Sequence, residues 1–298
     1  MNKKIQVLIV VLLVVAAFLA GSAGAKVKYG GSKIIPTPTI SAAPSPIPFN
    51  PKKSLIPEVK FFVMSFCPYG NQAEAGLELV YQLLKDKATW SPRYIINDKK
   101  ASCEQNCPYR IFNSDAESRC DEAIKQGQIK DMDTCKTYFP YTSTDECLTK
   151  ECAGLKAGEY ESLHGQVELN QDIREICAFN LGNLDKWWKF VSLTNEKCNS
   201  TDADTCWNQQ ATGAGLNTTQ ISTCAESQKV TLVNKEITEA EKYQASGSPM
   251  VFINDTVYNG GRAPEDYKKA ICLAFENPPE ECSTVLGEET AAASEGCE

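Results

Sequence analysis

Residues 59–70 read VKFFVMSFCPYG and mark an abrupt change from the proline-rich segment before them. The run at the start of this stretch is short, apolar and rich in valine and phenylalanine, as in a strand that is buried on both faces. It ends at Cys67-Pro68, and proline is well tolerated in the first turn of a helix because its missing N–H would have no helical partner there. The stretch therefore predicts a buried strand, a short connection and a helix that begins beside Cys67.

The residues after Pro68 have the spacing of an amphipathic helix. One apolar stripe at positions i, i+4, i+7 and i+11 consists of Ala73, Leu77, Val80 and Leu84. The unpaired N–H groups and the dipole at the start of such a helix favour an anion, and the thiolate is the form of cysteine that attacks disulfides. We therefore expect Cys67 to be an ionised, solvent-facing nucleophile.

The rest of the chain predicts a second strand, a helical region, a hairpin and a last helix. The second strand is expected at Arg93–Ile96, and residues 165–246 carry apolar residues at helical spacing. Within this region Asn183 is a candidate helix cap, and short separate helices are expected around Cys206, around Ile221 and over Glu236–Tyr243. The hairpin is expected around the two-residue turn Asn254-Asp255, and the last helix is expected from Pro264.

Six of the cysteines fall in a polar stretch, residues 98–158, that we interpret as a loop-rich insertion. They are Cys103, Cys107, Cys120, Cys135, Cys147 and Cys152. Because their number is even, all six can form disulfides with one another, and the sequence does not distinguish between the possible pairings. The spacings Cys103-x3-Cys107 and Cys147-x4-Cys152 are near those of a structural zinc site. Disulfides are the commoner fate of such cysteines in an oxidising compartment, and we expect no metal.

Another even set of cysteines lies outside the insertion. Cys272 and Cys282 flank the end of the last helix, and Cys198 and Cys206 flank a polar loop, so these two bridges are favoured. The bridge Cys177–Cys224 then follows by elimination. Cys67 and Cys297 remain. One hypothesis is that Cys297 reaches back to Cys67, where it resolves a mixed disulfide or protects the thiol. The better explanation is that Cys297 is an incidental thiol or forms an intermolecular bridge.

The composition indicates an exported protein. Fourteen cysteines in 298 residues favour an oxidising compartment, and residues 1–25 combine Lys3-Lys4 with a long apolar run. This segment is either a signal peptide cut after Ala25 or an N-terminal membrane anchor, and the proline-rich linker at residues 26–57 favours the anchor. We expect an extracytoplasmic protein attached to the membrane, or a secreted one if Ala25 is a cleavage site. The net charge of −8 and the absence of a basic block exclude nucleic acid as a partner.

The element order, with a cysteine after the first strand and Ser248-Pro249 before the third, resembles the thioredoxin-like fold. More narrowly, the chain resembles the DsbA-type thiol-disulfide oxidoreductases. The tracts that carry this resemblance are FFVMSFCPYGNQAE, LHGQVELNQDIREIC and SGSPMVFINDTVYNGGRAPEDYKKAIC. It implies an α/β thioredoxin-like domain at residues 58–285, interrupted by the cysteine-rich insertion at 98–158 and a helical insertion at 165–246. A flexible tail follows at residues 286–298.

The resemblance also implies a site. In that fold the proline matching Pro249 has a cis peptide bond and lies beside the active-site cysteine, where its backbone can pair with an extended substrate. The family's active site is Cys-x-x-Cys, whereas Gly70 holds the fourth position here. Without a second cysteine, a mixed disulfide at Cys67 must be released by another thiol. This favours isomerase-like or small-thiol-dependent chemistry over net oxidation.

The sequence as a whole predicts thiol-disulfide exchange on cysteine-containing exported proteins or a small thiol, with no cofactor. Cys67 is the expected nucleophile, Tyr69 would shape access to it, and Ser248 with Pro249 would present backbone to the substrate. His164, the only histidine, is a candidate base or pH-sensitive neighbour of Cys67, although most lone histidines have no such role. The alternative is a redox-silent binding or chaperone-like module that uses the same groove.

Overall fold

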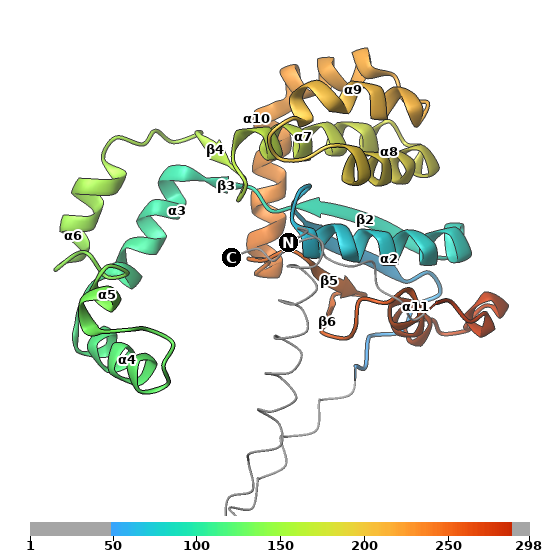
Figure 1. Ribbon diagram of the computed structural model, residues 1–298. Helices are drawn as coiled ribbons and strands as arrows, with labels where there is room; N and C mark the ends of the chain where they lie inside the picture. Colours follow the sequence, from blue (N-terminus) through green and yellow to red (C-terminus); the bar gives the residue numbers. More distant parts are fainter. Residues whose placement is uncertain (1–48, 288–298) are drawn as a thin grey trace, which may run out of the picture. The chain divides into compact units, whose positions relative to one another are not determined.

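The computed structural model describes residues 49–287 of the chain (Figure 1). The predicted export segment at residues 1–25, most of the proline-rich linker and Cys297 lie outside the described residues. Within residues 49–287, no helix has both the length and the apolar character needed to cross a membrane.

A four-stranded sheet with the order β2-β1-β5-β6 forms the centre of the fold. Strand β1 (Glu58–Val63) is parallel to β2 (Thr89–Tyr94) and antiparallel to β5 (Met250–Ile253), which pairs with β6 (Thr256–Tyr258). The inner position of β1 matches its nearly continuous apolar run. Strand β2 begins at Thr89 and ends at Tyr94, whereas the sequence predicted Arg93–Ile96. The buried residues of β2 alternate with more exposed ones, so this strand lacks the continuous apolar run by which β1 was recognised.

The hairpin between β5 and β6 turns at Asn254-Asp255, as predicted. Both residues have positive φ angles, 47° and 60°, which is the backbone of a type I′ turn. The Asn254 side chain also accepts a hydrogen bond from the backbone N–H of Glu58 at 2.8 Å. The turn is therefore fixed to the start of β1.

Helices cover the sheet. They are α2 (Pro68–Leu84), α7 (Gln166–Asn180), α8 (Leu184–Lys197), α9 (Ala203–Gly213), α10 (Thr218–Tyr243) and α11 (Pro264–Leu273), with short 3-10 turns η1 (Lys85–Lys87) and η4 (Glu280–Ser283). Helix α2 packs against α11 and α8, while α7, α8 and α9 pack on one another (Figure 1). The predicted fold class, a thioredoxin-like α/β fold with a helical insertion, is confirmed.

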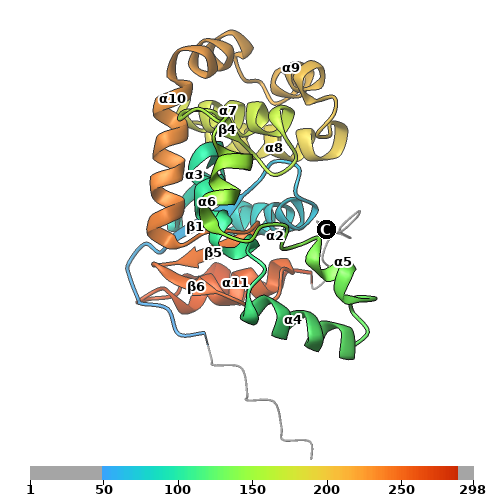
Figure 2. The same ribbon diagram turned by 90° about the vertical axis from the view of Figure 1, so that its left-hand side faces the viewer.

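Helix α10 is a single helix of 26 residues (Figure 2). The prediction of separate short helices in this part of the chain was wrong. The exposed polar residues 226–228 interrupt the apolar pattern, but no proline or glycine lies between Thr218 and Tyr243 to stop the helix.

Two tryptophans attach helix α8 to the sheet. Trp187 and Trp188 are 0% and 1% exposed, and the Trp188 ring stacks on Phe61 of β1 with 5.6 Å between ring centres. The indole N–H of Trp187 donates to the carbonyl of Glu175 at 3.0 Å. Both rings therefore belong to the core.

The insertion is mainly helical, which corrects the prediction of a loop-rich segment. It contains α3 (Lys99–Asn106), η2 (Cys107–Arg110), α4 (Ser114–Lys125), α5 (Met132–Lys136), α6 (Thr144–Cys147) and the π-helical turn η3 (Leu148–Cys152), between strands β3 (Asn97–Asp98) and β4 (Tyr160–Glu161). Its helices were missed because they lack an apolar stripe. They are capped by polar side chains and held together by disulfides instead.

Six disulfides are present among the described residues. Three close the insertion: Cys103–Cys152, Cys107–Cys147 and Cys120–Cys135. The other three are the pairs named from the sequence: Cys177–Cys224, Cys198–Cys206 and Cys272–Cys282. Within residues 49–287, Cys67 is the one cysteine outside these bridges.

The predicted cap of helix α8 gives a stability prediction. The Asn183 side chain accepts a hydrogen bond from the backbone N–H of Lys186 at 2.9 Å. Replacing Asn183 by alanine leaves that N–H without its acceptor and is expected to cost about 1 kcal/mol in urea unfolding. Asn183→Asp keeps the acceptor and should retain the parent stability. Equal losses in both variants would contradict a capping role.

Candidate functional site

The candidate site begins in the loop between β1 and α2. Cys67 has an extended backbone at the N-cap position, and Pro68 is the first residue of the helix. The backbone N–H of Cys67 donates to the carbonyl of Met64 at 3.1 Å, and that of Asn71 donates to the carbonyl of Cys67 at 2.9 Å. The cysteine therefore lies at the start of α2, where the sequence places it.

The side chain of Cys67 is buried, with 2% of its surface exposed, and the expectation of a solvent-facing sulfur was wrong. It packs in an apolar cluster with Phe62, Met64, Ile95, Ala240, Ala245 and Phe252. The loop after β2 and the end of α10 contribute to this cluster, and the local sequence around Cys67 gives no sign of either. Any reaction at this sulfur requires the surrounding side chains to give way.

Ser248 connects the two ends of the Cys67 loop. Its carbonyl oxygen accepts a hydrogen bond from the Cys67 thiol at 3.5 Å, and its hydroxyl oxygen accepts one from the backbone N–H of Met64 at 3.1 Å. The Ser248-Pro249 peptide bond is cis, as the resemblance implies. The structure thus brings together Cys67 and the Ser248-Pro249 pair, which are far apart in sequence.

Gly70, the fourth residue of the CPYG motif, packs directly against Ser248. A Cβ atom built on Gly70 would lie 2.5 Å from the Ser248 hydroxyl oxygen and 3.3 Å from the Met64 carbonyl oxygen. The first distance is shorter than any van der Waals contact allows. The Ser248 hydroxyl therefore takes part of the space that a side chain at position 70 would need.

Tyr69 lies half-buried at the edge of the Cys67 cluster. The guanidinium carbon of Arg262 lies 4.9 Å from the centre of its ring, within cation-π distance. Arg262 also donates a hydrogen bond to the Gln72 side chain at 3.2 Å. The segment before α11 thereby fixes the tyrosine beside the cysteine.

Three buried carboxylates on helix α7 were not recognised in the sequence. Glu168, Asp172 and Glu175 are all 0% exposed and occupy positions i, i+4 and i+7. Asp172 accepts hydrogen bonds from the backbone N–H of Ser65 at 3.0 Å and from its hydroxyl at 2.6 Å, and Glu168 accepts one from the N–H of Phe66 at 2.9 Å. Their spacing was visible in the tract LHGQVELNQDIREIC, but an acidic stripe usually faces solvent, so the pattern alone did not indicate burial.

Burial also changes the protonation of this acidic group. Removal from water, and then the nearby Glu168, raise the pKa of Asp172 well above its usual range. Burial raises the pKa of Glu175 from 4.5 to about 7. Glu74 of α2 is 2% exposed, and burial followed by the charge of Glu175 raises its pKa well above the usual range. The surroundings of the Cys67 loop therefore favour neutral carboxyl groups.

His164 is joined to the same loop through Glu168. Its ring Nδ1 lies 2.7 Å from one carboxylate oxygen of Glu168, the oxygen that also accepts from the N–H of Phe66. The backbone N–H of His164 donates to the other oxygen at 2.8 Å. His164 thus contacts a residue that holds the Cys67 loop, and a part for it in the chemistry stays a prediction.

The cysteines whose spacing resembles that of a zinc site form disulfides. The sulfurs of Cys103, Cys107 and Cys152 lie within 4.8 Å of one another, but each of these cysteines is bonded to another sulfur. The close approach comes from two adjacent bridges.

Residues 103–272, more than half of the chain, match a family model described as Thioredoxin. The chain therefore belongs to the thioredoxin family. The matched residues include Ser248 and Pro249, whereas Cys67 lies before them. No match was found among curated proteins.

The chain is also similar, at low identity, to several solved structures. DsbA from Mycobacterium tuberculosis is 12% identical with a TM-score of 0.43, over 79% of this chain and 95% of that chain. DsbG from the same organism is 12% identical with a TM-score of 0.43, over 78% and 89%. BdbD from Bacillus subtilis is 12% identical with a TM-score of 0.42, over 74% and 89%.

Proposed function

We propose that this protein is an exported thiol-disulfide exchange protein that acts through Cys67 alone. The observation that carries the proposal is the position of Cys67. It caps helix α2, lies outside the six disulfides, and contacts the carbonyl of Ser248 at 3.5 Å. A helix N-terminus stabilises the thiolate that attacks a disulfide.

The proposed reaction begins with attack of the Cys67 thiolate on a substrate disulfide. A bond forms between Cys67 and one substrate sulfur, and the other substrate sulfur leaves as a thiolate. Gly70 offers no second thiol, so the mixed disulfide is broken by a small thiol or by another cysteine of the substrate. The first route gives net exchange with the small thiol, and the second rearranges disulfides within the substrate.

The proposed substrates are exported proteins that contain cysteines. Ser248 and Pro249 would present backbone to an extended substrate segment beside Cys67. Tyr69, at the edge of the apolar cluster, would move to uncover the sulfur. We place the protein outside the cytoplasm, tethered by residues 1–25 or released after Ala25, because twelve cysteines of the described region are bridged.

A second candidate is a redox-silent binding or chaperone-like module. It is favoured by one observation, the 2% exposure of Cys67, since a buried thiol is commonly inert. In that case the surface beside Ser248 and Pro249 would hold unfolded segments without chemistry.

The two candidates differ in insulin reduction measured at a series of reduced glutathione concentrations. A single-thiol exchange protein should give a catalysed rate that rises in proportion to glutathione, because glutathione must release each mixed disulfide. Cys67→Ser should show only the uncatalysed rate. Parent activity in Cys67→Ser would remove Cys67 from the mechanism. Absence of catalysis in both proteins, with slowed aggregation of the released insulin chains, would favour the binding module.

A further inference from the structure

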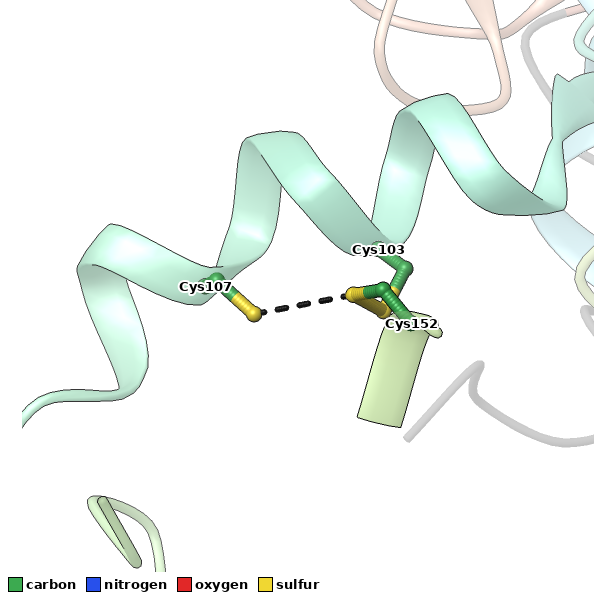
Figure 3. Close-up of side chains that lie close together, drawn as sticks. All are labelled: Cys103, Cys107 and Cys152. Atoms are coloured by element: carbon green, nitrogen blue, oxygen red, sulfur yellow. Dashed lines mark hydrogen bonds between the residues drawn. A yellow bond between two sulfur atoms is a disulfide. The ribbon is translucent and has the colours of Figure 1, made fainter. Parts of the chain in front are cut away.

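Two disulfides of the insertion lie side by side. Helix α3 and the following turn present Cys103 and Cys107 one helical turn apart, and they pair with Cys152 and Cys147. The sulfur of Cys107 lies 3.7 Å from the sulfur of Cys152, although these two are not bonded to each other (Figure 3). Reacting atoms in a productive complex approach to about 3–3.5 Å, so only a small movement separates these sulfurs from exchange.

The four cysteines differ in their access to solvent. Cys107, Cys147 and Cys152 are 1%, 0% and 3% exposed, whereas Cys103 is half-buried. Cys103 also lines a cavity of about 570 Å³ together with Lys99, Arg110 and Glu161. A thiol from solvent can therefore reach this pair of disulfides at Cys103, and the two basic side chains outnumber the single acidic one, which favours an anionic thiol.

We propose that these disulfides form a second exchange site, in which a thiol that enters at Cys103 releases a thiolate at Cys147. In the first step the incoming thiolate bonds to the Cys103 sulfur, and the Cys103–Cys152 bond breaks to leave Cys152 as the thiolate. In the second step Cys152 attacks Cys107 across the 3.7 Å contact. A Cys107–Cys152 bond forms, the Cys107–Cys147 bond breaks, and Cys147 takes the negative charge.

The exchange needs only the entering thiol as co-reactant. Each step forms one sulfur–sulfur bond and breaks one, so no net oxidation or reduction of the chain occurs beyond the mixed disulfide at Cys103. The site is independent of Cys67, and it adds to the proposed function a second place where a small anionic thiol enters the protein.

Limited reaction with reduced glutathione tests the proposal. The full chain carrying Cys67→Ser is treated briefly, quenched with an alkylating reagent under denaturing conditions, and mapped by mass spectrometry of unreduced peptides. The expected products carry glutathione on Cys103, a Cys107–Cys152 bridge and the alkyl label on Cys147. An alkyl label on Cys152 with the Cys107–Cys147 bridge intact would overturn the second step. Absence of glutathione from Cys103 would overturn the entry point.

A matched variant distinguishes the two-step exchange from a reaction that stops after the Cys103–Cys152 bond has opened. In Cys107→Ala/Cys147→Ala the second bridge is absent, so glutathione on Cys103 should leave the label on Cys152. The Cys120–Cys135 bridge, whose cysteines are 0% and 2% exposed, serves as the internal reference and should stay closed. Because Cys67 is absent throughout, the result does not depend on whether Cys67 is a nucleophile.

Discussion

Replacing Gly70 by cysteine, together with Ser248→Ala, is expected to convert the site into a dithiol. The Cβ atom at position 70 would lie 3.5 Å from that of Cys67, within the range of roughly 3.5–4.5 Å found in disulfides. Ser248→Ala removes the hydroxyl that would otherwise lie 2.5 Å from the new Cβ. A second thiol then resolves the mixed disulfide within the chain.

The measured result should be a change in both rate and concentration dependence. Insulin reduction by the double variant, with dithiothreitol as the terminal reductant, should exceed the parent rate by about tenfold or more, because a well-placed internal thiol has a high effective concentration. With the dithiothreitol concentration held fixed, the rate of the double variant should also be independent of added glutathione. Gly70→Ala/Ser248→Ala makes the same steric change without the thiol and is the matched control. Equal rates in the two double variants would contradict the idea that a missing resolving cysteine limits the parent.

Removing the carboxylate of Asp172 is expected to destabilise the protein and loosen the Cys67 loop. Asp172→Ala leaves the N–H and hydroxyl of Ser65 buried without their acceptor. Each of these two donors costs about 1–3 kcal/mol, so we expect a loss of about 2–6 kcal/mol in the free energy of unfolding. Urea unfolding at pH 7 measures it, and a loss below about 1 kcal/mol would show that the loop finds other acceptors.

Asp172→Asn is the matched control. We expect the difference in stability between this variant and the parent to depend on pH. Asparagine keeps the acceptor for Ser65 but cannot ionise. Because the pKa of Asp172 is raised on folding, the folded chain binds the proton more tightly than the unfolded chain. The contribution of Asp172 to stability is therefore fully present at acid pH, and it is lost as the pH rises from near the unfolded value, about 3.9, through the raised pKa.

The free energy of unfolding of Asp172→Asn should consequently rise relative to that of the parent as the pH rises. We expect Asp172→Asn to gain about 1 kcal/mol or more relative to the parent between pH 5 and pH 8, since one pKa unit corresponds to about 1.4 kcal/mol. Glu175, whose pKa is raised to about 7, still titrates in the variant and leaves it some residual dependence. Parallel stability curves for the two proteins would contradict a raised pKa at Asp172.

The sequence predicts the elements whose signals are local. The apolar run of β1, Pro68 at the start of α2, the Asn183 cap and the Asn254-Asp255 turn each combine a residue preference with its backbone position, and the structure contains all four. The helices of the insertion have capping residues, such as Asn113 and Asp131, but no apolar run marks the segments between the caps. These helices depend on disulfides between residues about 15 to 49 positions apart, and a single sequence does not specify that pairing.

The site was predictable only in part for the same reason. Cys67, Ser248 and Pro249 were named from the sequence because a motif marks them, and the structure brings them together. The burial of Cys67 was missed because the cluster in which it packs includes residues distant in sequence, such as Ile95 and Ala245. The carboxylate of Asp172 was missed because its role depends on Ser65, which lies on another element. Tertiary contacts of this kind leave no periodic pattern.

The reactivity of Cys67 in the folded protein is the most direct test of the account. The Cys297→Ser chain is incubated with oxidised glutathione at neutral pH, and its intact mass is measured with Cys67→Ser/Cys297→Ser as the control. The account predicts one glutathione on Cys67, none in the control, and its removal by reduced glutathione. A folded chain that takes up no glutathione until it is denatured would contradict the account and leave Cys67 as a buried structural thiol.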